Sequence, residues 1–301
     1  MPAVIFPGQG AQYLGMGQSL YQDFPQARDI FSSVDSILGF SLSDKCFRGE
    51  SSELKETATQ QLAILTVSLA AFEVFSQKNL KVDYLSGLSL GEYSCLYAAG
   101  VLSLKNLVVL VRARAQAMQE AARANPSTMF AVIGLEPDRL EDIAKREGFY
   151  IANINSPKQI VISLDKSRKD EIYKALEAQA AKAIELEVSG GFHSRFMNSA
   201  KEQLKKVMQG MEFSSAKIPI VSNFTASAHT KAVEIKQNLL EQLTSPVLWK
   251  GCVEFMIKSG VSSFFEIGPS KVLRGLIRKI DPEAKVINIG ESQDFASLSA
   301  G

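Results

Sequence analysis

The stretch Gly-Leu-Ser-Leu-Gly centred on Ser89 constrains this chain more than any other. A short apolar run at 82–85 precedes it, and a helix-like run at 92–99 follows it. Strand, sharp turn and helix in that order predict a nucleophile elbow, in which a serine hydroxyl stands at a strained turn. Gly87 and Gly91 let the strand and the helix approach closely, and the helix N-terminus favours an oxyanion. A plain serine in a glycine-rich turn is the alternative, but the flanking elements favour a nucleophile.

A second glycine-rich loop follows the first expected strand, at residues 3–6. Its Gly8-Gln9-Gly10 core lacks the Lys-Ser/Thr of a P-loop and the third glycine of the dinucleotide fingerprint. In the elbow architecture, a loop after another strand offers the second backbone N–H to the reacting carbonyl. We therefore expect the backbone of Gln9 to take that role.

A serine nucleophile needs a base, and neutral histidine is suited to that task near pH 7. His193 follows two glycines at an expected junction between units, where clefts form, and we expect it to open a helix. His229 lies in a polar stretch and is expected to be an exposed loop residue. We assign the base to His193. No carboxylate between Ser89 and His193 stands out as the third member of a triad, so a backbone carbonyl could fix the tautomer instead.

Two further polar residues occur in expected helices. Arg114 shares an apolar face with Leu110 and Met118, so it either extends its charged end to water or pairs with an acidic group. From the residues alone, a structural role for Arg114 leads. Gln60 stands at the head of a strongly apolar core helix, where an amide is more often a cap or solvated than part of a site.

Residues 128–188 differ in character from the rest of the chain. Their expected order is β-α-β-β-α-β, which is that of a ferredoxin-like split unit, and we interpret it as an insertion. Residues 1–127 and 189–301 would then form one large domain, whose strands alternate with helices and predict a parallel sheet covered on both faces. The expected strands are 3–6, 82–85, 129–134, 149–154, 159–164, 183–188, 218–223, 263–268 and 285–289. The expected helices after residue 80 are 92–99, 104–122, 137–147, 166–181, 196–208, 233–243, 246–256 and 270–279, with several more within 17–80.

Composition excludes some classes of function. With 301 residues, 46% of them hydrophobic, the chain can bury a large core. A net charge of +1 argues against a nucleic-acid binder. The N-terminus does not read as a signal peptide, and we expect no apolar run to approach the length of a membrane span. Three scattered cysteines indicate reduced, buried thiols in a cytosolic protein, and two histidines give a zinc site little to work with. The tail after Gly290 is rich in Ser and Ala, and we expect it to be frayed.

Taken together, the motifs resemble those of malonyl-CoA:acyl carrier protein transacylases, in order and spacing over nearly the whole chain. The motifs are Pro7-Gly8-Gln9-Gly10-Ala11-Gln12, Gly87-Leu88-Ser89-Leu90-Gly91-Glu92-Tyr93, Arg114 with Met118-Gln119, Asn153-x-Asn155-Ser156-Pro157-x-Gln159, Gly191-Phe192-His193-Ser194 and Gln242-Leu243-x-Ser245-Pro246-Val247-x-Trp249. The resemblance implies an α/β-hydrolase-like large domain with a ferredoxin-like insert.

The resemblance also implies roles for single residues. Ser89 would be the acylated nucleophile and His193 its base, with Gln242 orienting His193 through its main-chain carbonyl. The backbone N–H groups of Gln9 and Leu90 would form the oxyanion hole. Arg114 would hold the malonyl carboxylate in a bidentate pair, which explains an arginine rather than a lysine, and Gln60 would be a secondary site residue.

Three residues depart from the family pattern. Leu88 stands where His is common and could reshape the pocket near the acyl group. Ala115 stands where Gly is usual, and Gln61 where Pro is usual, and both departures read as structural. Phe192, directly before His193, resembles the residue found in malonyl-selective members.

The resemblance implies a cytoplasmic enzyme of fatty-acid or polyketide synthesis. By a ping-pong mechanism it would pass malonyl from malonyl-CoA to the phosphopantetheine thiol of acyl carrier protein. It would need no cofactor and would bind neither nucleic acid nor membrane. One alternative is a hydrolase of acyl-carrier thioesters on the same scaffold. Another is a non-catalytic module that docks acyl carrier protein, which intact Ser89, His193 and Arg114 disfavour.

Overall fold

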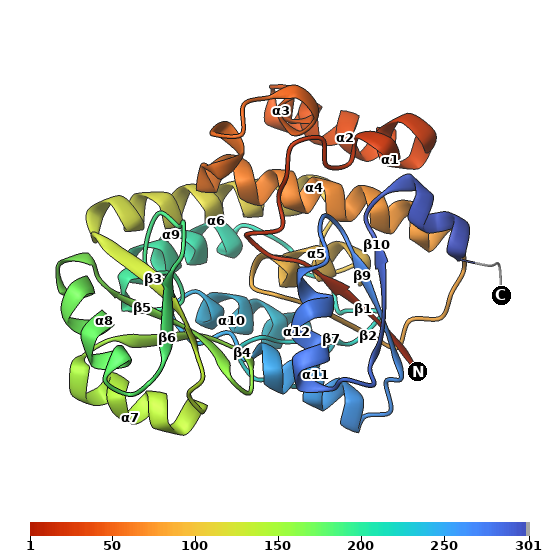
Figure 1. Ribbon diagram of the computed structural model, residues 1–301. Helices are drawn as coiled ribbons and strands as arrows, with labels where there is room; N and C mark the ends of the chain where they lie inside the picture. The colour runs from red at the N-terminus through yellow and green to blue at the C-terminus, as the bar shows by residue number, and fades with distance from the viewer. Residues whose placement is uncertain (299–301) are drawn as a thin grey trace.

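The computed structural model describes residues 1–298 and contains two separate sheets (Figure 1). The larger has six strands in the order β10-β9-β1-β2-β7-β8. From β10 to β7 every neighbouring pair is parallel, whereas β8 runs antiparallel to β7, so the expected parallel sheet has one reversed edge strand. Its strands are β1 (Pro2–Phe6), β2 (Tyr84–Gly87), β7 (Ile220–Val221), β8 (Ala228–His229), β9 (Ser263–Ile267) and β10 (Lys285–Ile289).

The strand β1 is apolar throughout, because both faces of the sheet are covered at this strand. Val4 and Phe6 belong to one hydrophobic core, while Ala3 and Ile5 belong to a second core. Successive side chains point to opposite faces of a sheet, so a strand covered on both faces buries its side chains at every position. Helices that contribute to the first core include α4 (Thr57–Ser76), α5 (Leu90–Ala98), α6 (Leu104–Ala124), α9 (Asn198–Gln209) and α10 (Ala232–Gln242), and those that contribute to the second are α11 (Trp249–Lys258) and α12 (Val272–Ile280).

The helix α4 corrects one expectation. Within residues 1–298 it is the one helix long and apolar enough to cross a membrane by length and composition, so the expectation that no apolar run approaches that length is wrong. However, 83% of its apolar window is buried inside the protein, as in the core helix of a soluble fold. In Figure 1 it lies between the larger sheet and an outer layer of helices.

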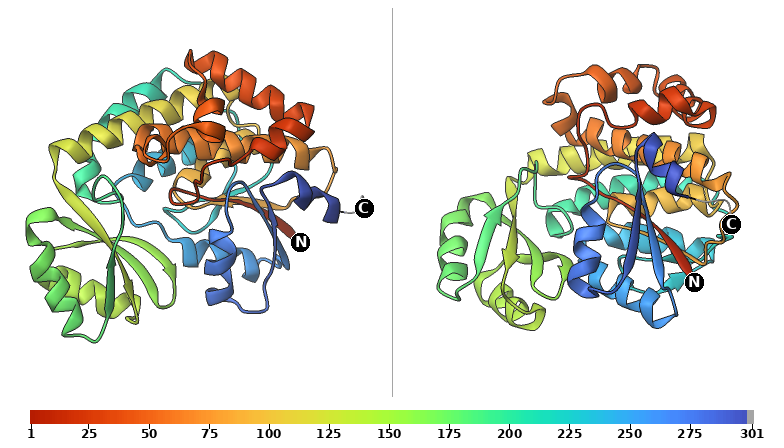
Figure 2. Two further views of the ribbon diagram at one scale, coloured as in Figure 1. Left: turned by 45° about the horizontal axis from the view of Figure 1, so that its top comes forward. Right: turned by 45° about the vertical axis from the view of Figure 1, so that its right-hand side comes forward.

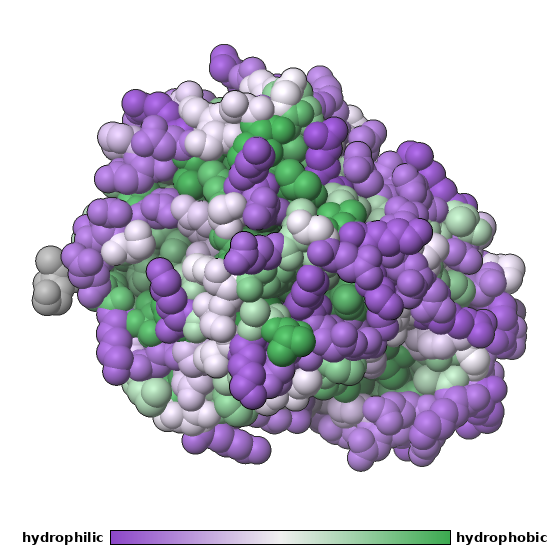
Figure 3. All heavy atoms as spheres, turned by 180° about the vertical axis from the view of Figure 1, so that it is seen from behind, coloured by the Kyte–Doolittle hydropathy of each residue, from purple (hydrophilic) through white to green (hydrophobic). Residues whose placement is uncertain are grey.

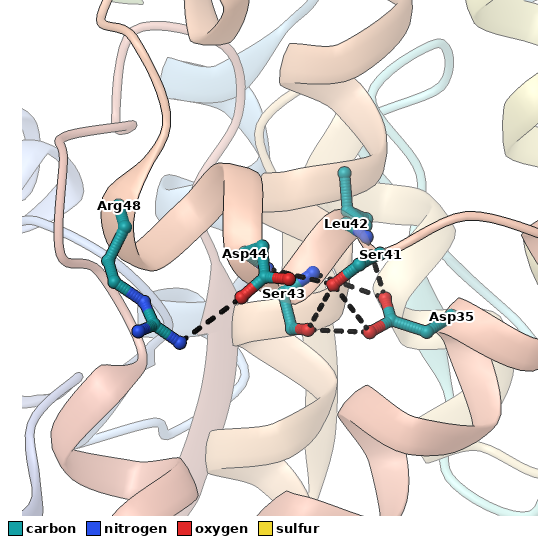
Figure 4. Close-up of polar contacts among 6 residues, drawn as sticks. All are labelled: Asp35, Ser41, Leu42, Ser43, Asp44 and Arg48. Atoms are coloured by element: carbon teal, nitrogen blue, oxygen red, sulfur yellow. Dashed lines mark hydrogen bonds and ion pairs between the residues drawn. The ribbon is translucent and has the colours of Figure 1, made fainter.

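That outer layer consists of α1 (Gln18–Asp23), α2 (Pro25–Leu38) and α3 (Leu42–Arg48), followed by a short 3₁₀ turn, η1 (Glu53–Lys55). Asp35 connects α2 to α3, because its Oδ1 accepts hydrogen bonds from the backbone N–H of Leu42 at 2.8 Å and of Ser43 at 3.1 Å (Figure 4). Ser41 caps the same helix by accepting from the N–H of Asp44 at 3.2 Å. Capping satisfies N–H groups that have no partner within the helix.

The smaller sheet is antiparallel, with the order β4-β5-β3-β6. Its strands are β3 (Ser127–Ile133), β4 (Tyr150–Ser156), β5 (Gln159–Asp165) and β6 (Lys182–Glu185), and its helices are α7 (Pro137–Glu147) and α8 (Lys169–Glu177). Phe130 and Val132 pack with these helices in a third core, whereas Met129 packs on the first core. Figures 1 and 2 show this sheet at one side of the molecule, with α12 between it and the larger sheet.

Several expected helices begin later or end earlier than their sequence pattern indicates. The helix expected over 246–256 begins at Trp249, because Val247 instead hydrogen-bonds to β4: its N–H donates to Ala152 O at 2.8 Å, and its O accepts from Ile154 N at 2.9 Å. The helix expected over 166–181 is a 3₁₀ turn, η2 (Lys166–Arg168), followed by α8, which ends before Ala180 adopts a φ of 57°.

Two further expectations, about His193 and about the C-terminal tail, are also wrong. His193 does not open a helix; a 3₁₀ turn, η3 (Arg195–Met197), precedes α9. The tail after Gly290 is not frayed over its described part, because η4 (Ser292–Ser297) carries a reciprocal capping box between Glu291 and Asp294. Residues 299–301 lie outside the described residues. Seen from behind, polar and apolar side chains are interspersed over the surface, as the mixed composition indicates (Figure 3).

Candidate active site

Ser89 occupies the turn between β2 and α5, with φ 51° and ψ −99°. A positive φ is uncommon for a serine and marks a strained turn. The turn requires its glycines. A Cβ on Gly87 would lie 2.1 Å from the carbonyl carbon of Gly91, and a Cβ on Gly91 would lie 2.1 Å from the carbonyl oxygen of Phe6. The expected elbow is therefore present, and backbone contacts fix its residue types.

The Gln9 loop packs directly on this elbow. A Cβ on Gly8 would lie 2.3 Å from the carbonyl oxygen of Leu88, so only glycine allows the two segments to come so close. Within residues 1–298, the backbone N–H groups of Gln9 and Leu90 donate no hydrogen bond to another protein group. Unpaired N–H groups beside a serine hydroxyl are what an oxyanion hole requires.

His193 lies between the serine and Gln242. Its Nε2 is 2.7 Å from Ser89 Oγ, and its Nδ1 is 2.8 Å from the backbone carbonyl of Gln242. A carbonyl only accepts, so Nδ1 carries the proton and Nε2 is left to accept from the serine. No carboxylate in the described chain hydrogen-bonds to His193. Its φ of 55° places the imidazole at a sharp turn rather than at a helix start.

The pKa of His193 is lowered to about 4, chiefly by burial and also by the nearby Arg114 guanidinium, whereas the hydrogen bond to Gln242 acts in the opposite direction. At pH 7 the imidazole is therefore neutral and able to accept a proton. His229 lies elsewhere: it is in β8, partly buried, and its Nδ1 is 3.0 Å from Glu234 Oε2. The expectation of an exposed loop residue is wrong for His229.

Arg114 lies behind the serine and is fully buried. Its Nη2 donates to Ser89 Oγ at 3.1 Å, and its guanidinium carbon lies 4.8 Å from the centre of the Tyr93 ring. Burial lowers the pKa of this guanidinium. Its Nε has no hydrogen-bond partner among the described residues. A buried arginine with an unused donor beside the nucleophile is able to bind an anionic group.

Two glutamines at the head of α4 behave differently from expectation. Gln61 Oε1 accepts from Arg114 Nη1 at 2.6 Å, so this departure from the family pattern contacts the site directly and is not only structural. Gln60 is also buried, but its Oε1 accepts from Gln9 Nε2 at 2.6 Å, and it does not line the cavity at Ser89. Gln60 is thus one side chain removed from the serine.

Two residues of the site escaped the sequence reasoning. Glu92, 2% exposed, accepts at Oε2 from Gln242 Nε2 at 2.7 Å and from the Asn223 N–H at 2.9 Å. Asn223 Oδ1 in turn accepts from the Ser89 N–H at 2.6 Å. Burial raises the pKa of Glu92 to about 6, against the lowering effect of these hydrogen bonds. The signal for Glu92 was its position in the first turn of the elbow helix; nothing local in the sequence marks Asn223.

A cavity of about 270 Å³ opens onto Ser89 and His193. It lies where the smaller sheet faces α12 and the Gln9 loop. Its walls are largely apolar, with a few amide side chains among them. They comprise Gln9, Leu88, Met129, Ala131, Asn153, Asn155, Gln159, Val161, Leu186, Val188, Phe192, Val272 and Leu276. Leu88 and Phe192, both singled out from the sequence, lie in this wall, whereas Ala115 is buried away from it.

The cysteines do not take part in this chemistry. Cys46, Cys95 and Cys252 are all buried and free. Burial raises the pKa of each thiol, which disfavours the reactive thiolate. Within residues 1–298, no three His, Cys, Asp or Glu side chains come together as a metal site.

Comparisons with known proteins agree on one family. A family model described as the acyl transferase domain matches residues 4–289. The chain is 41% identical over 298 residues to the malonyl CoA-acyl carrier protein transacylase of Bacillus subtilis, covering 97% of this chain and 94% of that protein. A solved transacylase of that name from Xanthomonas oryzae has a TM-score of 0.94 at 37% identity, covering 98% of this chain and 96% of the other. A malonyl-transacylase solved in complex with a type II PKS acyl-carrier protein has a TM-score of 0.93 at 33% identity, covering 98% of both chains.

Proposed function

This chain belongs to the acyl transferase domain family, and we propose that Ser89, His193 and Arg114 carry out the malonyl transfer for which its relatives are named. The protein is an acyltransferase that moves malonyl from malonyl-CoA to the phosphopantetheine thiol of acyl carrier protein, in fatty-acid synthesis. The observation that carries the proposal is the contact of Ser89 Oγ with both His193 and Arg114, which joins a nucleophile, a base and a fixed cation.

The first step uses the neutral imidazole. His193 Nε2 accepts the Ser89 hydroxyl proton while Oγ attacks the thioester carbonyl carbon of malonyl-CoA. The Nδ1–H of His193 remains hydrogen-bonded to the carbonyl oxygen of Gln242, and this bond stabilises the imidazolium and keeps the ring in place. Gln242 thereby does through its main chain what a carboxylate does in a common triad.

The second requirement is stabilisation of the tetrahedral oxyanion. The N–H groups of Gln9 and Leu90 are the donors we assign, because Leu90 directly follows Ser89, Gln9 lines the same cavity, and neither N–H has another partner among the described residues. Donors placed before the reaction need no reorganisation as charge develops. The C–S bond then breaks, His193 returns its proton to the leaving sulfur, and malonyl remains on Ser89 as an ester.

The malonyl carboxylate binds Arg114. One guanidinium edge is already held by Gln61, and Nε is unused, so a carboxylate can pair with Nε and Nη2 beside the serine. The hydrogen bond from Nη2 to Ser89 Oγ also brings the cation to the acyl group that forms there. An acetyl group has no charge to use this cation, so Arg114 distinguishes the two.

The second half of the reaction reverses these steps with a different thiol. The phosphopantetheine thiol enters the cavity, gives its proton to His193 and attacks the malonyl ester, and Ser89 Oγ leaves with that proton. The largely apolar wall of the cavity favours a thiol on a long arm over free water. The chemistry needs only side chains, backbone amides and substrate, so we propose that no metal or other cofactor takes part.

The fold also suggests a division of labour. We propose that residues 1–127 and 189–301 form an α/β-hydrolase-like catalytic domain and that residues 128–188 are a ferredoxin-like insert. The elbow after β2 supports the first part, and the strand order β4-β5-β3-β6 with two helices supports the second. Gln60 supports the Gln9 loop from behind and is a secondary site residue. We further propose a cytoplasmic location.

Intact-mass measurement after mixing with malonyl-CoA tests the proposal. The wild-type protein should gain one malonyl group, and Ser89→Ala should gain none while its circular dichroism spectrum is unchanged. Loss of a nucleophile or its base lowers the rate by roughly 10⁴ to 10⁶. His193→Ala should therefore be as slow as Ser89→Ala, whereas the matched variant His229→Ala should acylate within about twofold of the wild type, since Glu234 holds His229 outside the site.

A malonyl adduct on Ser89→Ala would contradict the assignment of the nucleophile. The fate of the adduct distinguishes the hydrolase alternative. A malonyl enzyme that persists until holo acyl carrier protein is added supports the transferase, and rapid release of free malonate would identify a hydrolase.

A further inference from the structure

The structure contains a buried carboxylate in the active site that the proposed chemistry does not use. Glu92 lies one helical turn after Ser89 on α5. Its Oε2 accepts two hydrogen bonds, one from the side chain of Gln242 and one from the backbone of Asn223. Ionised carboxylates are rarely so buried unless their charge is compensated. The question is what this one holds in place.

The first branch leads to the base. The Gln242 backbone carbonyl receives the Nδ1–H of His193, while the Gln242 side chain donates its Nε2 to Glu92 at 2.7 Å and to the carbonyl of Ser89 at 3.2 Å. The Gln242 residue is therefore fixed at both ends. Without Glu92, the side-chain amide would lose its charged partner, and the carbonyl that orients the imidazole would lose its anchor.

The second branch leads to the nucleophile. Asn223 accepts the Ser89 N–H at Oδ1 and donates its Nδ2 to the Gly87 carbonyl at 2.8 Å, so it bridges the strained elbow from residue 87 to residue 89. The backbone N–H of the same asparagine donates to Glu92. A turn with a positive φ at a serine persists only when its surroundings hold it.

The third feature is the order of charges. Gln242 Oε1 lies 3.5 Å from Arg114 Nη2, and Gln242 Nε2 faces Glu92. The amide dipole thus points its oxygen to the cation and its N–H to the anion. The flipped amide would reverse both contacts, so the two charges select one orientation of Gln242. No hydrogen bond or ion pair joins Glu92 and Arg114 directly within the described chain, so Glu92 does not compete with a substrate carboxylate for the guanidinium.

We propose that Glu92 is a positioning residue of the malonyl transfer, one carboxylate that fixes His193 through Gln242 and Ser89 through Asn223. Its role is that of the acid of a catalytic triad, but it acts on the histidine through one intervening residue, Gln242. The inference rests on the proposed function of the site and concerns the reactivity of Ser89. It predicts that acylation slows when the charge of Glu92 is removed, while substrate affinity changes little.

Glu92→Gln is the informative variant, because it keeps the size of the side chain and one carbonyl acceptor but removes the charge. Exchanging charged for neutral hydrogen bonds should lower the acylation rate constant about ten- to a hundredfold. KM for malonyl-CoA should stay within about threefold, because Glu92 does not line the cavity. The acylation rate constant of Glu92→Ala should be lower still, and it is interpreted only if this variant folds.

The pH profile separates positioning from a merely structural role. The Glu92→Gln side chain resembles the protonated carboxyl, and burial raises the pKa of Glu92 to about 6. The wild-type advantage over Glu92→Gln should therefore be full at pH 8 and shrink towards unity at pH 5. The titratable or charged groups that face Glu92 are Arg114 of α6, His229 of β8, Cys252 of α11, and Tyr93 and Cys95 of its own helix. The profiles are recorded in the His229→Ala background as well.

Glu73→Gln is the matched control. Glu73 of α4 accepts from the Tyr97 hydroxyl of the same helix α5 at 2.6 Å, but it lies outside the site. It should acylate at the wild-type rate at every pH. If Glu92→Gln stays within twofold of the wild type at pH 8, or loses the same factor at pH 5 and pH 8, the proposal is overturned.

A second readout is independent of malonyl. Sulfonylation of Ser89 by phenylmethylsulfonyl fluoride, followed by intact mass, reports how well serine and histidine are aligned. Glu92→Gln should slow this reaction by the same factor as acylation. A wild-type protein that is sulfonylated but not malonylated would refute the proposed function and leave the Glu92 comparison intact. Equal sulfonylation of both proteins would overturn the role of Glu92.

Discussion

At the scale of single residues, Arg114 tests whether this site is built for a charged acyl group. Its guanidinium is fully buried and touches Ser89 Oγ, while Gln61 holds its other edge. Leaving a substrate carboxylate unpaired in such a place costs about 3–5 kcal/mol, which is two to four decades in rate. Arg114→Ala should therefore reduce kcat/KM for malonyl-CoA by that factor and leave acetyl-CoA equal or improved. Arg114→Lys should recover only part, because an ammonium group cannot form the fork.

The measurement is kcat/KM for both substrates in both variants. An equal fall for malonyl-CoA and acetyl-CoA would mean that Arg114 supports the structure rather than binding the carboxylate. Thermal unfolding of each variant shows whether a loss of fold contributes to the loss of activity.

Single residues also show how much of the site can be predicted from the sequence. Ser89 and His193 lie together, and each sits in a local pattern with few physical uses, whereas the contact of His193 with the backbone of Gln242 is one that only the family resemblance implies. The sequence predicts a structural role for Gln61, yet its side chain hydrogen-bonds to Arg114. Glu92 and Asn223 were missed, because their importance arises from contacts over 131 and more positions along the chain. Such contacts follow from the tertiary fold, and only the position of Glu92 in the first turn of the elbow helix marks either residue locally.

At the scale of elements, the elbow depends on backbone contact between β1 and α5. A Cβ on Gly91 would lie 2.1 Å from the Phe6 carbonyl oxygen, and backbone cannot turn aside as a flexible side chain can. Gly91→Ala should therefore destabilise the protein by about 3 kcal/mol or more and abolish acylation. Gly275 is the matched position: it lies inside α12 with nothing within 4 Å of its Cβ, so Gly275→Ala should stabilise by about 0.5–1 kcal/mol.

Urea unfolding at pH 7 compares the two variants with the wild type. If Gly91→Ala unfolded at the wild-type urea concentration, the close approach of helix and strand would not be needed for the elbow.

Element ends were less predictable than element types. The apolar run of β1 and the amphipathic pattern of α7 placed these elements well, since burial dictates both patterns. The helix α11 begins three residues later than the sequence predicts, because Val247 hydrogen-bonds to β4 instead. A sequence pattern cannot reveal that a helix-like residue has a strand partner in the other sheet.

At the scale of the whole molecule, two buried groups of the site couple its stability to pH in opposite directions. His193 has its pKa lowered from 6.5 to about 4, so the unfolded chain takes up this proton first and stability falls as pH drops from 6.5 to 4. Glu92 has its pKa raised from 4.5 to about 6, so the folded protein takes up that proton first and stability rises as pH drops from 6 to 4.5. Linkage gives a loss of about 3 kcal/mol for the first and a gain of about 2 kcal/mol for the second.

Single variants separate these two contributions. Asparagine tolerates the φ of 55° found at His193 and does not titrate, so His193→Asn removes the first contribution with little backbone strain. Between pH 7 and pH 4, His193→Asn should lose about 3 kcal/mol less than the wild type, and Glu92→Gln should lose about 2 kcal/mol more. Free energies of unfolding in urea at the two pH values measure both differences. If all three proteins lost stability in parallel on acidification, neither group would be coupled to folding through its burial, and acid sensitivity would have to arise from carboxylates elsewhere on the protein.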